Sequence, residues 1–519
     1  MGEALLLLVV IGAVALTAFA RSKGIQAGLV IVVIAGGVSF IPGIERLELE
    51  PELILGLVMP PLLYSATQSF SFFSFIRNLR PIVGLGLGLV LVTTAAVAGL
   101  TSWLLPSIGA AGALVLAATV SPPDTVTTVT HGKELGLSKK VIAILTGESL
   151  VNDATALAIF SVAIAAAVGE QTFIEQPVLL FGYGVFVGVL VGFALAAIAV
   201  WVRGRVGNPT LATTVSVLVP FAAFLLAEQL HASGVLAVVF AGFFVAVNTN
   251  HDQRATRHES QHLTRLQERN VWPVLDVLLE SFVFAYIGLQ LKFVIDDLVD
   301  SGEEVGQTIV VGLVVLLVVM LVRVAYVYIV FTRTAIGVKM RAKQLERSNR
   351  ARLRQAWGRR VRKRQGRPDR RPPIVLTWKE RLLVSWTGMR GIVTLAAAGA
   401  IPATTATGEA FPGRASIQFI AFVVAIGTLV IQGATLPMLA RWLDVDTTEE
   451  DAEARQGLVA AERVAATQST PDAQRLAIST AVRENEVEDE YARVVINRID
   501  LQQAADEAAA EAANGQSTH

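Results

Sequence analysis

The chain has 519 residues, 53% of them hydrophobic, and equal numbers of acidic and basic residues, so its formal net charge is zero. Long, nearly uninterrupted apolar runs account for this composition and indicate a membrane protein rather than a soluble one. The sequence contains no cysteine, which excludes disulfides, thiolate metal sites and cysteine redox motifs.

The first apolar run, residues 4–20, follows Glu3 and precedes Arg21 and Lys23. A signal peptide carries its positive charges before the apolar region, so we predict that this run is retained as the first span. These runs are too long and too continuously apolar for barrel strands, which predicts an all-α polytopic membrane protein. Counting them predicts thirteen transmembrane helices, near residues 4–20, 25–41, 52–68, 81–105, 109–129, 140–167, 177–202, 209–230, 233–249, 271–292, 306–332, 378–401 and 415–441.

The loops between these runs alternate between basic and acidic. The basic set includes a dense block, residues 339–371, within the loop 333–377, and the acidic set includes residues 45–52 and 296–304. The positive-inside rule then places the basic loops and the C-terminus in the cytoplasm and the N-terminus outside, in the plasma (inner) membrane. We expect the basic block to anchor this topology, or to bind anionic lipid headgroups or the acidic tail.

Two domains are predicted: a transmembrane domain, residues 1–442, and a cytoplasmic tail, residues 443–519. The tail is rich in Glu and Asp and contains helix-like stretches such as residues 472–499, whereas residues 504–519 are predicted to be disordered. Three roles are compatible with this composition: a dimerisation element, a regulatory element or a solvated extension.

Two predicted spans are interrupted. In the fifth span, Pro122 and Pro123 cannot donate backbone hydrogen bonds, and Asp124 follows them directly. In the twelfth span, Gly388 and Gly391 flank Met389 and Arg390. Irregular backbone at membrane depth is tolerated only where it lines a cavity or is buried in protein. Because paired broken helices mark the binding sites of many transporters, we predict two inverted six-helix repeats with broken fifth and twelfth helices.

The sixth run carries Glu148, Ser149, Asn152 and Asp153 at its centre. Carboxylates at membrane depth are costly, and they usually mark a functional site. On a helix, residues 149, 152 and 153 share one face and form a compact oxygen-rich surface, while Glu148 lies beside it. This pattern predicts a cation and proton site in the core of a transporter.

A count of the predicted mid-membrane charges leaves one carboxylate to bind an exchangeable ion. Asp124, Glu148 and Asp153 are the predicted mid-membrane acids, and Arg323 and Arg390 are the predicted bases. Arginine stays protonated and needs a carboxylate partner when it is buried, so two of the acids are expected to form structural pairs. A proton, Na⁺ or K⁺ must neutralise the third acid, and competition between them gives exchange.

Asp153 is the best candidate for that third acid and for the Na⁺-binding carboxylate. Ser149 and Asn152 offer neutral oxygens beside it, and the broken fifth span could add the backbone carbonyl of Pro123. A cation channel would not need the broken-helix pair, and an organic solute would need a larger and less acidic site. We expect neither an enzyme nor a cofactor, because the sequence shows no soluble catalytic domain or Walker motif. No nucleic-acid partner is expected.

Several motifs resemble one family. Residues 147–154, Gly-Glu-Ser-Leu-Val-Asn-Asp-Ala, resemble the Asn-Asp signature of the NhaP/NHE-type sodium/proton exchangers, in the first monovalent cation:proton antiporter family. Residues 388–391 resemble the Gly-x-Arg-Gly stretch of that family, and residues 60–64, 233–237 and 287–291 are also similar to it. The resemblance extends over residues 1–442.

This resemblance implies a homodimeric exchanger of Na⁺, or alternatively of Li⁺ or K⁺, for protons by alternating access. It implies that Asp153 binds the ion, with Asn152, Ser149 and Asp124 around it, and that exchange is electroneutral. It further implies that Glu148 pairs with Arg323 and Asp124 with Arg390, although the swapped pairing fits the charge count equally well. Two departures bear on cation affinity. Many relatives have a threonine where this chain has Pro123, and many have a glutamate where it has Ser65.

Overall fold

A computed structural model describes residues 2–516 apart from residues 24, 45, 48–53, 125–131, 133–135, 170–175, 252–260, 356–375 and 485. The described residues form helices and connecting loops, with one isolated β-bridge between Thr404 and Ala410, which confirms the predicted all-α class. Seven described helices are long and apolar enough to cross a membrane, and four shorter apolar helices accompany them. The total of thirteen spans stays a prediction. Most of the basic block 339–371, with its predicted lipid contact, lies outside the described side chains.

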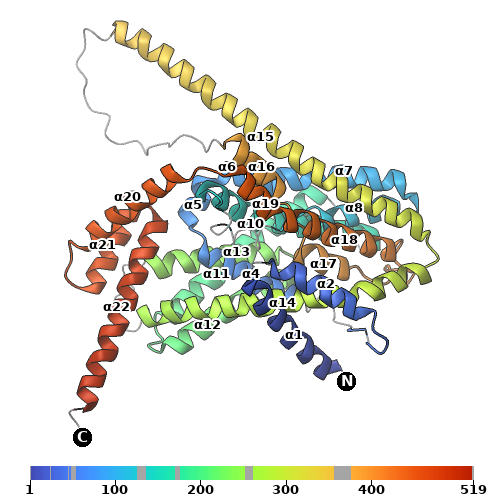
Figure 1. Cartoon of the computed structure of the whole chain (residues 1–519), viewed down its shortest axis with the longest axis horizontal. Coiled ribbons are helices and arrows are strands. Elements are labelled where there is room, and N and C mark those ends of the chain that lie inside the picture. Colours follow the sequence, from blue (N-terminus) through green and yellow to red (C-terminus); the bar gives the residue numbers. More distant parts are fainter. Residues whose placement is uncertain are drawn as a thin grey trace.

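The membrane helices pack into two bundles, which Figure 1 shows side by side. Each bundle draws on both halves of the chain. The first bundle consists of α1 (Gly2–Ser22), α2 (Ala27–Ser39), the π-helical turn Ile54–Val58 with α4 (Met59–Ser69), α11 (Pro177–Arg203), α12 (Pro209–Gln229), α13 (Gly234–His251) and α14 (Gln261–Asp300).

The second bundle contains the two interrupted spans. Short helix α5 (Phe72–Arg77) leads into it from the first bundle. Its members are α6 (Leu79–Val83), the π-helical turn Gly84–Leu89 with α7 (Val90–Leu104), the turn Pro106–Ile108 with α8 (Gly109–Val120), α10 (Lys139–Val168), α15 (Val305–Gln355), α16 (Trp378–Trp386), α17 (Ile392–Gly399), α18 (Arg414–Thr428), the π-helical turn Leu429–Gly433 and α19 (Ala434–Leu443).

The sequence explains where helix α10 begins and ends. The side chain of Ser138 caps its first turn by accepting from the backbone N–H of Val141. Its other end is Gly169, whose positive φ of 80° closes the helix in a conformation that favours glycine. Between these caps, the helix runs for 30 residues without proline and spans the second bundle.

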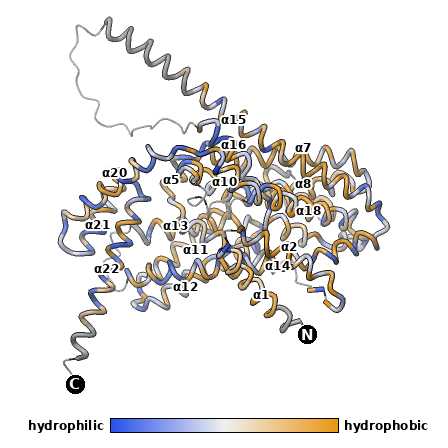
Figure 2. Tube along the Cα trace, in the orientation of Figure 1, coloured by the Kyte–Doolittle hydropathy of each residue, from blue (hydrophilic) through white to orange (hydrophobic). Residues whose placement is uncertain are grey.

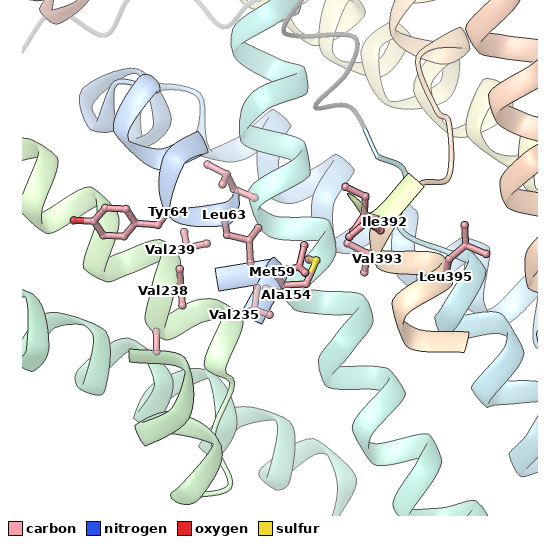
Figure 3. Close-up of a cluster of buried hydrophobic side chains, with 14 of the residues drawn as sticks. Met59, Leu63, Tyr64, Ala154, Val235, Val238, Val239, Ile392, Val393 and Leu395 are labelled. Carbon is pink, nitrogen blue, oxygen red and sulfur yellow. The ribbon is translucent and has the colours of Figure 1, made fainter. Parts of the chain in front are cut away.

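The bundles meet through apolar side chains. Figure 3 shows Ala154 of α10 close to Met59 of α4 and Val235 of α13, with Ile392 and Val393 of α17 on the other side. All five side chains are buried. An apolar contact of this kind has no directional bonds to break.

The tail folds into a separate helical domain. Helices α20 (Thr448–Ala465), α21 (Pro471–Arg483) and α22 (Asp489–Gln516) pack around their own apolar core, which includes Ile478 and Ala492. Figure 2 shows more hydrophilic residues on these helices than on the two bundles. Helix α22 continues to Gln516, so residues 504–516 are helical where the sequence predicted disorder. Alanines with high helix propensity fill this stretch and account for the difference.

Close packing of α2 against α14 depends on Gly288. A Cβ atom at this position would lie 2.6 Å from Ala35 Cβ and 2.7 Å from the carbonyl oxygen of Val32. We therefore expect Gly288→Val to lower the stability of the purified protein by about 1–3 kcal/mol, the usual cost of overpacking. Thermal unfolding in detergent measures this. Gly37→Val on α2 is the matched control, because a Cβ there meets no atom within 4 Å. Equal melting temperatures for the two variants would contradict the prediction.

Candidate ion site

The polar residues of α10 lie at the centre of the second bundle. Glu148, Ser149, Asn152 and Asp153 are all buried, in the middle of a helix that is otherwise apolar. The structure therefore places the predicted group together in the interior of the second bundle.

Asn152 connects α10 to the interrupted fifth span. Its Nδ2 donates a 2.7 Å hydrogen bond to the backbone carbonyl of Pro123, which has no helical partner because the ladder ends at Val120. Pro123 thus lies beside the oxygen-rich face of α10, as the sequence predicted. Within the described part of the chain, Asn152 Oδ1 and Asp153 Oδ1 are buried and accept no hydrogen bond. Buried oxygens of this kind are costly unless something else satisfies them.

The two interrupted spans cross each other next to this group. The backbone N–H of Asp124 donates a 2.6 Å hydrogen bond to the carbonyl of Met389, between α16 and α17. Asp124 also lies against Gly391, where any Cβ atom would collide with its carboxylate. The glycine at position 391 therefore leaves room for the Asp124 side chain where the two breaks meet.

Arg323 and Glu148 form a buried ion pair. Arg323 Nη1 lies 2.5 Å from Glu148 Oε1 and Nη2 lies 3.2 Å from Oε2, and both side chains are 0% exposed. Nη2 also donates to the carbonyls of Val384 and Thr387, at the broken end of α16. The Arg323 side chain occupies the space that a Cβ at Gly388 would need. This pair thus joins α10, α15 and α16.

Arg390 is bound differently from the prediction. Instead of forming an ion pair with Asp124, its guanidinium donates to the backbone carbonyls of Val120, at 3.1 Å, and Gly388. The carbonyls at the C-terminal end of a helix carry partial negative charge, and Val120 is the last residue of α8. The interrupted helix therefore supplies acceptors that the sequence-based charge count had assigned to a carboxylate.

Asp153 has both acidic and basic neighbours in the second bundle. It interacts electrostatically with Asp124 and Glu148, and Arg323 and Arg390 supply positive charges nearby. Among these five described residues, the acids outnumber the bases by one.

Two further carboxylates lie on α14, in the first bundle. Ser65 of α4 donates a 2.6 Å hydrogen bond to Asp276 Oδ2, and Glu280, one turn further along, interacts electrostatically with Asp276 and Asp124. From the sequence, Glu280 was interpreted as a structural residue near a membrane end or facing protein, and Asp276 was not singled out. Their spacing of four residues within the apolar run 271–292 was a usable signal, since it places both on one helix face. An acid thus lies next to Ser65.

The chain was compared with protein families and known proteins. The family model "Sodium/hydrogen exchanger, transmembrane" matches residues 5–442. An uncharacterised Na⁺/H⁺ exchanger of Mycobacterium tuberculosis is 30% identical over 421 residues, which cover 80% of this chain and 69% of that protein. A sodium, potassium, lithium and rubidium/H⁺ antiporter of Bacillus subtilis is 29% identical over 400 residues, which cover 76% of this chain and 54% of that protein.

Among solved structures, the sodium proton antiporter MjNhaP1 of Methanocaldococcus jannaschii, at pH 8, has the same fold. It superposes with a TM-score of 0.57 at 16% identity, and the match covers 85% of this chain and 98% of that one. These comparisons confirm the resemblance carried by residues 147–154 and 388–391. The chain belongs to the sodium/hydrogen exchanger family.

Proposed function

We propose that this protein exchanges one monovalent cation for one proton across the plasma membrane, with Asp153 as the shared binding group. The observation that carries this proposal is the buried carboxylate of Asp153, whose Oδ1 accepts no hydrogen bond within the described part of the chain. Because this carboxylate carries a single charge, a cation or a proton can occupy it, but not both. Strict competition of this kind makes the exchange electroneutral.

We propose that Asp153 Oδ1 and Asn152 Oδ1 are direct ligands of the cation. The bond from Asn152 Nδ2 to Pro123 fixes the amide and leaves its oxygen available. Ser149 lies one helical turn before Asn152 and Asp153 on the same face and supplies a hydroxyl oxygen. Oxygen ligands suit alkali-metal cations, and the proton needs only the carboxylate. Asp124 contributes negative charge beside the site, and Pro123 contributes its carbonyl.

Transport would proceed by alternating access, with the second bundle moving against the first. The apolar contact around Ala154 supports this division, since it offers a sliding surface beside the site. We further propose a homodimer with the N-terminus outside and the C-terminus in the cytoplasm. Whether Na⁺, Li⁺ or K⁺ is the cation is open to test, and the Bacillus relative is named for several of them.

Substitution of Asp153 tests the central claim. In liposomes with an imposed pH gradient, we expect Na⁺, Li⁺ or K⁺, but not choline, to collapse the gradient when the wild-type protein is present. Asp153→Asn should abolish this collapse, because an amide cannot exchange a proton for a cation. An internal pH dye measures the collapse of the gradient for the wild type and for Asp153→Asn. Asp297→Asn, at an exposed ion pair with Arg46, is the control and should transport normally. Wild-type rates from Asp153→Asn would refute the one-carboxylate mechanism.

Glu280 is expected to raise cation affinity without binding the cation tightly itself. Its charge interacts with Asp124 across the boundary between the bundles. At alkaline pH, where Glu280 is ionised, we expect Glu280→Gln to raise the cation concentration for half-maximal exchange about two- to tenfold, because a nearby negative charge is lost. The maximal rate should change less. A Glu280→Asp variant should retain most of the affinity. An unchanged half-maximal concentration in Glu280→Gln would show that Glu280 is structural.

We expect the charge of Glu148 to stabilise the folded protein. Removing one partner of a buried ion pair leaves an uncompensated charge and costs about 3–5 kcal/mol. Glu148→Gln should therefore unfold at a much lower temperature than the wild type in detergent. The control is Asp297→Asn, whose exposed pair should contribute about 1 kcal/mol or less. Comparable melting temperatures for the two variants would mean that the buried pair stabilises the protein no more than the exposed pair does.

A further inference from the structure

The C-terminal helical domain, α20–α22, contacts both bundles. It follows directly after α19 of the second bundle, through a connection of residues 444–447. Its helices α21 and α22 pack against α13 and α14 of the first bundle. Figure 1 shows the domain at one end of the two bundles, beside the ends of α11, α12 and α14. Any relative motion of the bundles must therefore be accommodated by this domain.

The contact with the first bundle is buried and strong. Asp500 of α22 is 0% exposed and accepts two hydrogen bonds from Arg265 of α14, at 2.6 and 2.8 Å. Arg475 of α21 binds the same carboxylate at 2.8 Å. His262 of α14 lies 3.0 Å from Glu507, and Arg493 donates a 2.9 Å hydrogen bond to the backbone carbonyl of residue 68 in α4. Bidentate, desolvated pairs of this kind are geometrically demanding and hold their partners in a fixed arrangement.

The contact with the second bundle is more exposed. It includes Lys139 and Lys140, the first residues of α10, the helix that carries Asp153. Lys139 Nζ lies 3.1 Å from Glu490, with side chains 35% and 51% exposed, and also lies over the ring of Tyr491. Lys140 Nζ lies 3.2 Å from Glu450, with side chains 49% and 11% exposed, and Glu450 also accepts from the backbone N–H of Lys139. Exposed ion pairs contribute little and are screened by salt.

From this asymmetry we infer that the C-terminal domain acts as an electrostatic latch, that is, a set of ion pairs that restrains the movement of α10 relative to the first bundle. It stays attached to the first bundle through Asp500 and holds the start of α10 through Glu450 and Glu490. For α10 to move relative to the first bundle, the two lysine pairs must open while the arginine pair stays closed. The latch therefore slows the exchange cycle at low cytoplasmic ionic strength and releases it as ionic strength rises. This inference rests on the proposed exchange function.

Neutralising the latch tests it in the complete protein. We expect Glu450→Gln/Glu490→Gln to exchange about two- to fivefold faster than the wild type at low ionic strength, the range for losing exposed ion pairs. Raising the ionic strength with choline chloride at fixed Na⁺ should accelerate the wild type and remove the difference. The control is Glu484→Gln/Glu486→Gln, which neutralises two acids between α21 and α22 that make none of these contacts. Equal rates for the wild type and the Glu450/Glu490 variant at low ionic strength would overturn the latch.

A reducible cross-link supplies an independent test, since the chain has no cysteine of its own. With a short thiol cross-linker, Lys140→Cys/Glu450→Cys should lose exchange when cross-linked and regain it on reduction. His262→Cys/Glu507→Cys, on the first-bundle side, should transport equally well in both states. Full exchange by the cross-linked 140/450 pair, or equal inhibition of both pairs, would refute the latch.

The 140/450 cross-linking yield needs no transport and separates this inference from the proposed function. Because the Lys139–Glu490 pair remains in this variant, the yield should fall as ionic strength rises, and a constant yield would refute the latch. Failure of the wild type to exchange any cation would refute the proposed function instead.

Discussion

The ion pair between Glu148 and Arg323 is the constraint on which the second bundle depends. Two opposite charges in a membrane interior are tolerated only when they are paired and their remaining hydrogen bonds are made. Here the arginine satisfies this condition by joining the carboxylate on α10 to the open carbonyls at the end of α16. The pair therefore fixes both the depth of α10 and the position of the break in the twelfth span. It also removes one acid from the chemistry of the site.

The second arginine shows how a broken helix becomes part of an ion site. Arg390 binds the carbonyl at the end of α8, so the helix terminus substitutes for a carboxylate partner. Asp124 is then held by its own backbone N–H and by close contact with Gly391. Its carboxylate interacts electrostatically with Asp153.

The sequence was sufficient to predict the helical class, both interruptions and the group on α10. Each of these depends on a local property: an apolar run, consecutive prolines, or a spacing of three and four residues. The partner of Arg390 could not be predicted, because the carbonyls that bind it become available only when two distant breaks cross. The partner of Asp276 could not be predicted for a related reason. Its contact with Ser65 joins helices about two hundred positions apart, and no pattern within α14 identifies the hydroxyl that it accepts from.

The backbone bond between the two breaks and the bond from Asn152 to Pro123 both lie within the second bundle. The oxygens of the site therefore keep their mutual arrangement when that bundle moves as a body. In the proposed mechanism, this bundle carries the same ligands to either compartment. The two ion gradients then set the direction of the proposed exchange, and reversing both gradients reverses the flux.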